Sequence, residues 1–205
     1  MKLGRLQLVV AGFAFLAAGV PAMAQDDSAE TKLALNTPRL QLFQGDGTNF
    51  VLTDPLLYRV QKTGRTITVP AGFVTDFASV PWYARSVISV LGRHSIAAIV
   101  HDYLYWDQRC TRDQADALLA EAMAEYGSTQ FQRSVVYYAV KYRASGAWDE
   151  NTADRKNGLI RILTGVHRRI PLNTEWEAYR KLLKEQNVQE PPVEAETPSY
   201  CALSK

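Results

Sequence analysis

The spacing of hydrophobic and polar positions predicts a small sheet followed by a helical body. Three short runs rich in branched and aromatic residues predict strands, and Asp54-Pro55 and Gly64 provide turns between them. These runs are Phe50–Leu52, Leu56–Val60 and Thr66–Val69. Beyond Trp82 the apolar residues recur at helical spacing. We therefore predict an α+β domain in which a small antiparallel sheet packs against a mostly helical body.

Capping residues and glycines divide the helical body into segments. The expected helices run from Trp82 to about Leu91, from Ser95 to about Trp106, from a Thr111–Gln114 capping box to Glu125 or Tyr126, from Ser128 to Gly146, and from a Thr174–Glu177 capping box to about Gln186. In the fourth helix Phe131, Val135, Tyr138 and Tyr142 recur at helical spacing, and we expect them in the core. Between Glu150 and Arg169 the helical signals weaken.

The two ends of the chain differ from its centre in composition. Residues 1–24 combine Lys2 and Arg5 with an apolar run and the small-x-small pattern Ala22-Met23-Ala24, which predicts a signal peptide and export to the periplasm or beyond. The apolar run is shorter than the ~20 residues of a membrane-spanning helix, so we expect no transmembrane anchor after cleavage. We expect a flexible lead-in at 25–38, a single globular domain at 39–187, and a Pro- and acid-rich tail at 188–205.

Charge and cysteine content narrow the function classes. The chain has 23 basic and 21 acidic residues, and cleavage after Ala24 would remove two basic ones and leave a formally neutral chain. Overall charge therefore gives no support to nucleic-acid binding. Cys110 and Cys201 are either a disulfide, which export permits, or two free thiols. Two cysteines so far apart make a cysteine-based metal site improbable.

An imidazole and a carboxylate stand side by side at His101 and Asp102, near the end of an apolar run suited to a core. Burying either group without a partner is costly. Tyr105, four residues after His101, shares its helix face. The short connection to the next helix predicts an antiparallel pair, with His101 roughly 7.5 Å from the end of one helix and Asp116 roughly 6 Å from the start of the other. The two side chains should therefore lie level and within reach of each other.

These residue types in this arrangement predict chemistry. A carboxylate bonded to one ring nitrogen of a histidine fixes the tautomer and raises the basicity of the other nitrogen, as a general base requires. We therefore assign His101, Asp116 and Tyr105 to catalysis. Asp102, on the adjacent face, is a candidate ligand for a hard divalent cation, and Asp76 with the carbonyls of its loop supplies further candidate oxygen ligands.

Each of these residues also has a structural interpretation. His101 and Asp116 could be a buried pair that serves folding alone, since such pairs occur without function. Asp102 could be a cap or an ion-pair partner, and Tyr105 an ordinary core aromatic. His94, two helical turns before His101, either joins a metal site or lies on the surface.

Four motifs in order along the chain resemble domain of unknown function family 1353, which is found in bacterial and phage proteins. They are Val69-Pro70-Ala71-Gly72-Phe73, Thr75-Asp76-Phe77-Ala78-Ser79-Val80-Pro81, His101-Asp102-Tyr103-Leu104-Tyr105 and Ala115-Asp116. The resemblance covers roughly Phe50 to Trp148. It implies a domain type and carries no established reaction with it.

A second resemblance, confined to the two central helices, is to the small secreted calcium-dependent phospholipases. Their His-Asp-x-x-Tyr signature is similar to His101, Asp102 and Tyr105, and their second-helix aspartate to Asp116. It implies that His101 activates a water, Asp116 orients it, and Asp102 binds a calcium ion that stabilises the oxyanion. The chain has neither their Gly-rich calcium loop nor the cysteines that flank their helices.

Together these observations favour an exported, metal-assisted hydrolase of a cell-envelope component, with an envelope lipid as one candidate substrate. A histidine-aspartate phosphohydrolase fits less well, because its first histidine normally lies far upstream. The alternative from another class is a non-catalytic envelope or phage-derived interaction domain that keeps His101 and Asp116 as a structural pair.

Overall fold

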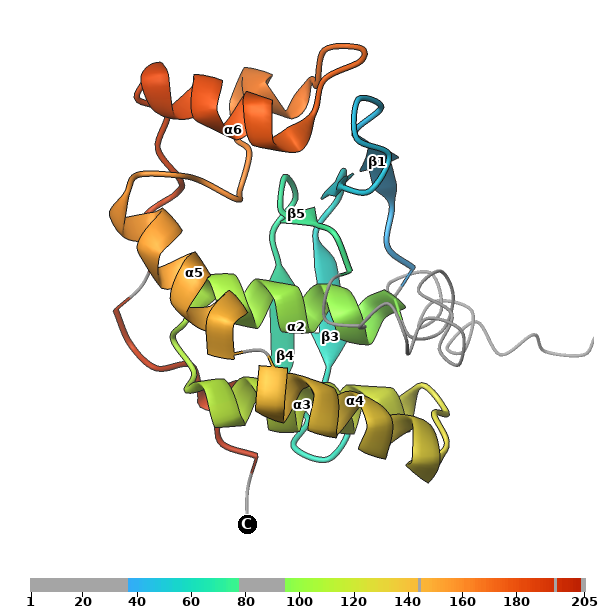
Figure 1. The fold of residues 1–205 in the computed structure, drawn as a ribbon. Helices are drawn as coiled ribbons and strands as arrows, with labels where there is room; N and C mark the ends of the chain where they lie inside the picture. The colour runs from blue at the N-terminus through green and yellow to red at the C-terminus, as the bar shows by residue number, and fades with distance from the viewer. Residues whose placement is uncertain (1–36, 78–94, 144, 194, 204–205) are drawn as a thin grey trace, which may run out of the picture.

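The computed structural model describes residues 37–77, 95–143, 145–193 and 195–203, with the arrangement shown in Figure 1. The strands are β1 (Leu40–Leu42), β2 (Phe50–Leu52), β3 (Leu56–Arg59), β4 (Thr66–Val69) and β5 (Val74–Thr75). The helices are α2 (Ser95–Asp107), α3 (Arg112–Glu125), α4 (Gln130–Arg143), α5 (Ser145–Lys156) and α6 (Trp176–Glu185), with the short 3₁₀ turns η1 (Gly165–Arg168) and η2 (Ser199–Cys201). The predicted α+β class is confirmed.

The strands form two antiparallel sheets, where the sequence predicted one. In the first sheet β2 lies between β1 and β5, and β3 pairs with β4 in the second. Strand β2 does not pair with β3, because both edges of β2 are already occupied. Leu42 lies opposite Phe50 on one side, and on the other the Leu52 N–H donates to the carbonyl of Phe73 at 2.9 Å.

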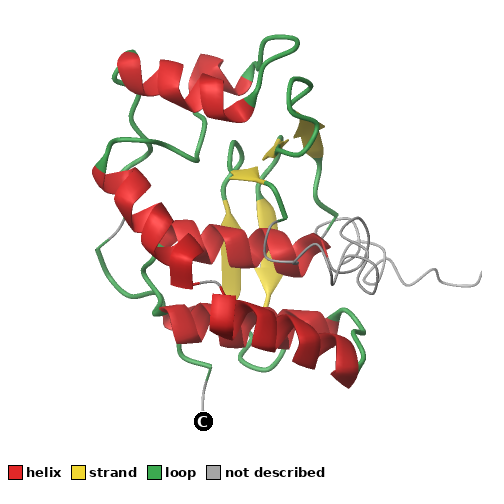
Figure 2. Cartoon of the chain, viewed as in Figure 1, coloured by secondary structure: helices red, strands yellow, loops and turns green. Residues whose placement is uncertain are grey.

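Helix α2 lies at the centre of the molecule. All its residues are buried, and it contacts α3, α5, β4 and β5. Figure 2 shows it crossing the β3–β4 hairpin, with α3 and α4 beyond it on the side away from α6. A helix that is buried all round has no solvent face on which a polar side chain could be hydrated. Every polar group on α2 therefore needs a partner inside the protein.

The local signals that start helices were accurate to within one residue in two cases. Thr111 caps α3, and the predicted capping box with Gln114 is present. Helix α4 begins one residue later than predicted, because Thr129 and Gln132 exchange the capping-box hydrogen bonds in place of Ser128. A local capping motif is therefore a reliable indicator of where these helices start.

Two predictions beyond Tyr142 were wrong. Gly146 was expected to end a helix, but it lies in the first turn of α5, a helix that the sequence did not predict. The predicted Thr174–Glu177 capping box is absent, since α6 has no side-chain cap from its own N-terminal residues. Instead Asp46, in the turn between β1 and β2, accepts the N–H of Trp176 at 2.8 Å. A carboxylate from a distant loop thus caps α6.

The aromatic stripe of α4 faces solvent, which contradicts its predicted place in the core. Phe131, Tyr138 and Tyr142 are 68%, 57% and 71% exposed. The helix instead buries Val136, Ala139 and Val140. These small and β-branched residues let α4 approach α3 and α5 closely. With this face of α4 turned inward, the bulky rings on the opposite face point outward.

The tail after Val188 returns to the main core. A disulfide joins Cys110 to Cys201, which settles the alternative left open by the sequence. It brings Tyr200 and Cys201 into the same apolar cluster as α2 and α3. Within the described part of the chain, no helix combines the length and apolar character needed to cross a bilayer. The predicted signal peptide, most of the predicted lead-in and the predicted helix at 82–91 lie outside the described residues.

Candidate functional site

The candidate site lies between α2 and α3, where three side chains meet at one oxygen. His101 Nε2 lies 2.9 Å from Asp116 Oδ1, and the Tyr105 hydroxyl donates to the same oxygen at 2.6 Å. The helices are joined by a short connection, so residues 101 and 116 come level as the helical rise predicts. The predicted contact of His101 with Asp116 is confirmed. Its catalytic role stays a prediction.

Asp116 fixes which ring nitrogen of His101 carries the proton. A carboxylate only accepts hydrogen bonds, so Nε2 is the ring nitrogen that donates in this contact. The hydroxyl of Tyr105 is the second donor to the carboxylate. Burial, with the hydrogen bond and the charge of Asp116, raises the pKa of Tyr105. Tyr105 therefore stays protonated and remains a donor at any pH at which the protein works.

Helix α5 supports this group from behind. The ring of Tyr105 packs against that of His101, with centroids 4.1 Å apart, and meets the edge of Trp148 at 5.1 Å. Asn151 donates from its side-chain amide to the carbonyl of Tyr105 at 3.2 Å. Sequence reasoning missed the contacts of Trp148 and Asn151 with Tyr105, because α5 itself was not predicted. They hold the rotamer of Tyr105 and, through it, the position of Asp116.

Asp102 accepts a hydrogen bond from β5. The hydroxyl of Thr75 donates to Asp102 Oδ2 at 2.5 Å, and Thr75 Oγ1 accepts the N–H of Phe77 at 3.3 Å. This contact joins the segment Thr75–Phe77 to α2 beside His101. Sequence reasoning singled out Asp76 in this segment and missed Thr75. The neighbour that does contact α2 is a fully buried threonine.

Asp76 faces a cation. Its Oδ1 is 3.5 Å from the guanidinium of Arg161, and its side chain is about one-third exposed. Among the described residues no group of three or more His, Cys, Asp or Glu side chains could hold a metal ion. Asp102 and Asp76 as cation ligands stay a prediction, and the calcium site stays a prediction from the resemblance. His94 and Ser79 lie outside the described residues.

The His101 group is buried. His101 is 1% exposed, Tyr105 4% and Asp116 5%. All three are therefore removed from bulk water, in surroundings where a hydrogen bond to a carboxylate is stronger than on the surface. The same burial makes the group expensive to disrupt.

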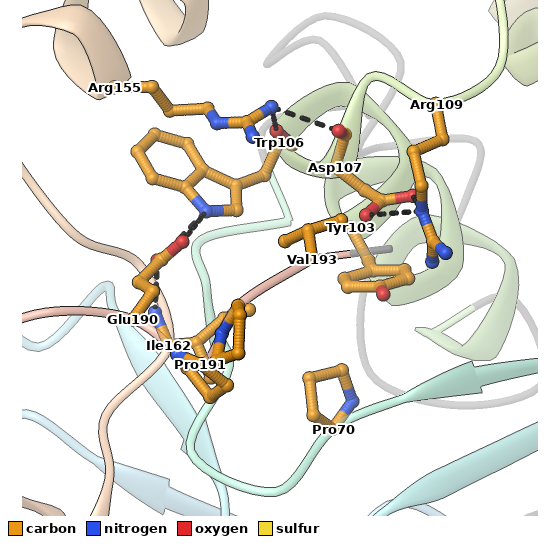
Figure 3. Close-up of a pocket in the computed structure, with 11 residues that line it drawn as sticks. Pro70, Tyr103, Trp106, Asp107, Arg109, Arg155, Ile162, Glu190, Pro191 and Val193 are labelled. Carbon is orange, nitrogen blue, oxygen red and sulfur yellow. Dashed lines mark hydrogen bonds and ion pairs between the residues drawn. The ribbon is translucent and has the colours of Figure 1, made fainter. Parts of the chain in front are cut away.

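A separate pocket of about 320 Å³ opens on the other side of α2. Its wall includes Tyr103 and Asp107, which lie about 200° and 240° round the helix from His101. Figure 3 shows how the tail closes it, with Glu190 reaching the indole of Trp106. Glu190 also accepts the N–H groups of Arg161 and Ile162.

The charges around this pocket are satisfied from within the protein. Burial raises the pKa of Glu190, although its hydrogen bonds from Arg161, Trp106 and Ile162 act in the opposite direction. Arg155 donates to the carbonyls of Trp106 and Asp107 at the end of α2 (Figure 3). Such contacts satisfy the carbonyls that the last turn of a helix leaves open. Sequence reasoning missed Glu190, because a Pro-rich tail has no periodicity to indicate what it contacts.

Comparison with known proteins agrees with the first resemblance. Residues 50–140 match the model of a family described as protein of unknown function (DUF1353). The match spans the β2–β4 strands, the Thr75 segment and the helices that carry His101 and Asp116. No curated protein and no solved structure matches the chain.

Proposed function

We propose that this chain is a hydrolase of a cell-envelope component in which His101 acts as the general base. The single observation that supports this most is the position of Asp116 Oδ1, which receives both His101 Nε2 and the Tyr105 hydroxyl. A general base needs a fixed tautomer and a fixed ring, and these two hydrogen bonds supply both.

In the proposed reaction His101 Nδ1 takes a proton from a water molecule as the water attacks the substrate carbonyl. Asp116 then stabilises the imidazolium that forms, because its carboxylate already faces Nε2–H. As the tetrahedral intermediate collapses, the bond between the carbonyl carbon and the leaving group breaks, and the imidazolium returns the proton to the leaving group. Tyr105 keeps Asp116 in place and does not take part in the proton transfer, since its own pKa is raised by burial. Asp102 and Thr75 hold β5 against the helix that carries the base.

The choice of an envelope substrate rests on the predicted signal peptide and on the local resemblance to secreted phospholipases. Both support an ester-linked lipid as the first substrate to test. The cation that the resemblance implies would polarise the ester carbonyl when bound.

The second candidate is a non-catalytic interaction domain with a structural His101–Asp116 pair. The observation that favours it is the burial of the site, since His101 is 1% exposed. A ring that never meets water or substrate would contribute to stability and to the uniqueness of the fold alone.

Hydrolysis assays on the chain without residues 1–24 separate the two candidates. The substrates are phospholipid vesicles and peptidoglycan, each with calcium and with a chelator. We expect His101→Gln, whose side-chain amide reaches the position of Nε2, to lower the rate by about 10²–10⁴-fold with little change in Tm. His167→Gln, on the surface turn η1, is the matched control and should leave both unchanged.

Two outcomes would count against the hydrolase. One is a His101→Gln variant that is as active as the original chain, because then the ring is not the base. The other is an original chain that hydrolyses none of the substrates while His101→Gln lowers only Tm. The second outcome is what the structural pair predicts.

A further inference from the structure

The surface of α4 carries the most aromatic exposed stripe of any described helix, and neither α3 nor α5 covers it. Phe131, Tyr138 and Tyr142 are separated by seven and four residues, so they lie on one face. Tyr137, 38% exposed, extends the stripe at its side. We call these four residues the aromatic face. Bulky rings exposed together in this way mark a contact surface.

The rings of the aromatic face are ordered against one another. Tyr138 and Tyr142 stack with centroids 6.2 Å apart and planes 5° from parallel. The ammonium of Lys141 lies 5.6 Å from the ring centre of Tyr137 and 5.9 Å from that of Tyr142. A cation therefore stands among the rings, at the level where they meet solvent.

The charge of α4 is of one sign. Its sequence contains Arg133, Lys141 and Arg143 and no acidic residue. The helices on either side carry acids as well as bases, with four acids in α3 and three in α5. Arg133 lies on the other side of α4, where it donates to the carbonyl of Ser128 at 3.2 Å, so Lys141 is the basic residue that lies among the rings. The aromatic face therefore presents a positive charge and no acid of its own helix, which favours an anionic partner.

We propose that the aromatic face of α4 docks the protein onto an anionic phospholipid bilayer. Tyrosine and phenylalanine rings with lysine and arginine beside them suit the boundary between headgroups and acyl chains, where ring bodies are apolar and hydroxyls stay wet. Lys141 adds attraction to anionic headgroups. The same charge disfavours a second copy as the partner, because a two-fold interface centred on the rings would bring the two Lys141 ammonium groups together.

The proposal goes beyond the proposed hydrolase and does not depend on it. Helix α4 packs on α3, the helix that carries Asp116, so docking through α4 would hold the candidate site close to the membrane. Vesicle binding is measured without any reaction. A failure of hydrolysis and a failure of docking are therefore distinguishable.

The test is co-sedimentation of the chain lacking residues 1–24 with vesicles of phosphatidylcholine and phosphatidylglycerol in roughly a 3:1 ratio. We expect the double variant Phe131→Ser/Tyr142→Ser to bind at least about tenfold more weakly than the original chain. Leu172→Ser is the matched control, since Leu172 is 79% exposed on a different surface. It should bind as the original chain does.

A charge variant tests the electrostatic part. Lys141→Gln should lower the affinity by about fivefold on the anionic vesicles and leave binding to pure phosphatidylcholine unchanged. Lys181→Gln, on the exposed side of α6, is its control and should have no effect. Higher salt should weaken binding of the original chain more than that of Lys141→Gln.

Three results would overturn the proposal. The original chain does not bind the anionic vesicles, or the double variant binds them as tightly as the original chain does. In the third, sedimentation equilibrium without lipid shows a dimer that Phe131→Ser/Tyr142→Ser abolishes, which would assign the aromatic face to a second copy. Circular dichroism of each variant checks that α4 is still helical.

Discussion

Helices α2 and α4 are nearly equal in length and both are rich in aromatic residues, yet the protein uses them in opposite ways. Helix α2 is buried on every side and carries His101, Asp102 and Tyr105 with it into the interior. Helix α4 buries only a narrow strip and leaves its aromatic face in solvent. In α2 the polar groups are paired with protein partners, and in α4 the large rings meet water.

This difference shows that the type of a residue, aromatic or polar, does not by itself indicate whether its side chain is buried. Hydrophobic spacing identifies a stripe on a helix, but a stripe reaches the core only if another element covers it. In α2 the strands and α3 and α5 cover every face. In α4 the cover lies on the side of Val136 and Val140. The side chains of the two helices should therefore contribute very differently to stability.

The largest expected effect is at the interior group. Asp116→Ala removes the acceptor shared by His101 and Tyr105 and leaves two buried donors without it. We expect a loss of about 3–5 kcal/mol in the free energy of unfolding, measured by urea denaturation. Asp113→Ala, an exposed acid in the first turn of the same helix, should cost less than about 1 kcal/mol. Equal losses for both variants would show that the α2–α3 group is not stabilising.

The disulfide comes next. It links Cys110, three positions after the end of α2, to Cys201 in the tail, 91 residues further along the chain. Replacing both Cys110 and Cys201 by Ser should lower the free energy of unfolding by about 2–4 kcal/mol, because a long loop in the unfolded chain is no longer closed. Calorimetry of the original chain with and without reductant should give the same difference. No change on reduction would mean that contacts of the tail alone hold it in place.

Asp46 provides an intermediate case, a surface group that caps a helix. Partial burial acts to raise its pKa, but the N–H groups of Trp176, Asn49 and Thr48 and the amide of Asn49 lower it below the ordinary 3.8. A lowered pKa in the folded state means that this stabilisation is complete above about pH 4 and is lost as the pH falls through the folded value.

Asp46→Ala should therefore cost about 1 kcal/mol at pH 7, with solvent screening keeping the value modest. The two chains should converge in stability as the pH falls below the lowered pKa of Asp46. Urea denaturation at a series of pH values measures this. A stability difference that grows on acidification would show that the Asp46 carboxylate does not stabilise the folded state in its charged form.

The smallest effect belongs to the aromatic face of α4. Phe131→Ser and Tyr142→Ser should each change the free energy of unfolding by less than about 0.5 kcal/mol, since neither ring is buried. Rings of this size in a core would cost about 3–5 kcal/mol on truncation. Urea denaturation of the single variants distinguishes the two cases, and a loss above about 2 kcal/mol would return these rings to the core.

Much of the site's geometry follows from local sequence signals. The Thr111–Gln114 capping box fixes the start of α3, and helical rise then fixes the level of Asp116 against His101. Tyr105 follows from its spacing to His101. None of these steps needs information from outside residues 95–125, which is why they could be predicted.

The features that could not be predicted depend on contacts between distant segments. Asp46 caps α6 across 130 residues, and Thr75 reaches Asp102 across 27. Helix α5 was missed because Gly146 was taken as a helix end, although its first turn tolerates a glycine. The exposure of the rings on α4 depends on which face of the helix packs against α3. The spacing of residues along the sequence does not determine which face that is.

The reach of Glu190 has a consequence for how the protein can be divided. Its carboxylate accepts hydrogen bonds from the Trp106 indole and from the main-chain N–H groups of Arg161 and Ile162. Glu190 itself lies outside the segment from β2 to α4. A fragment trimmed to residues 50–140, the part that matches the family, would expose the far wall of α2 and strand its indole. A stretch that keeps these contacts therefore extends at least to Glu190, well past the segment that matches the family.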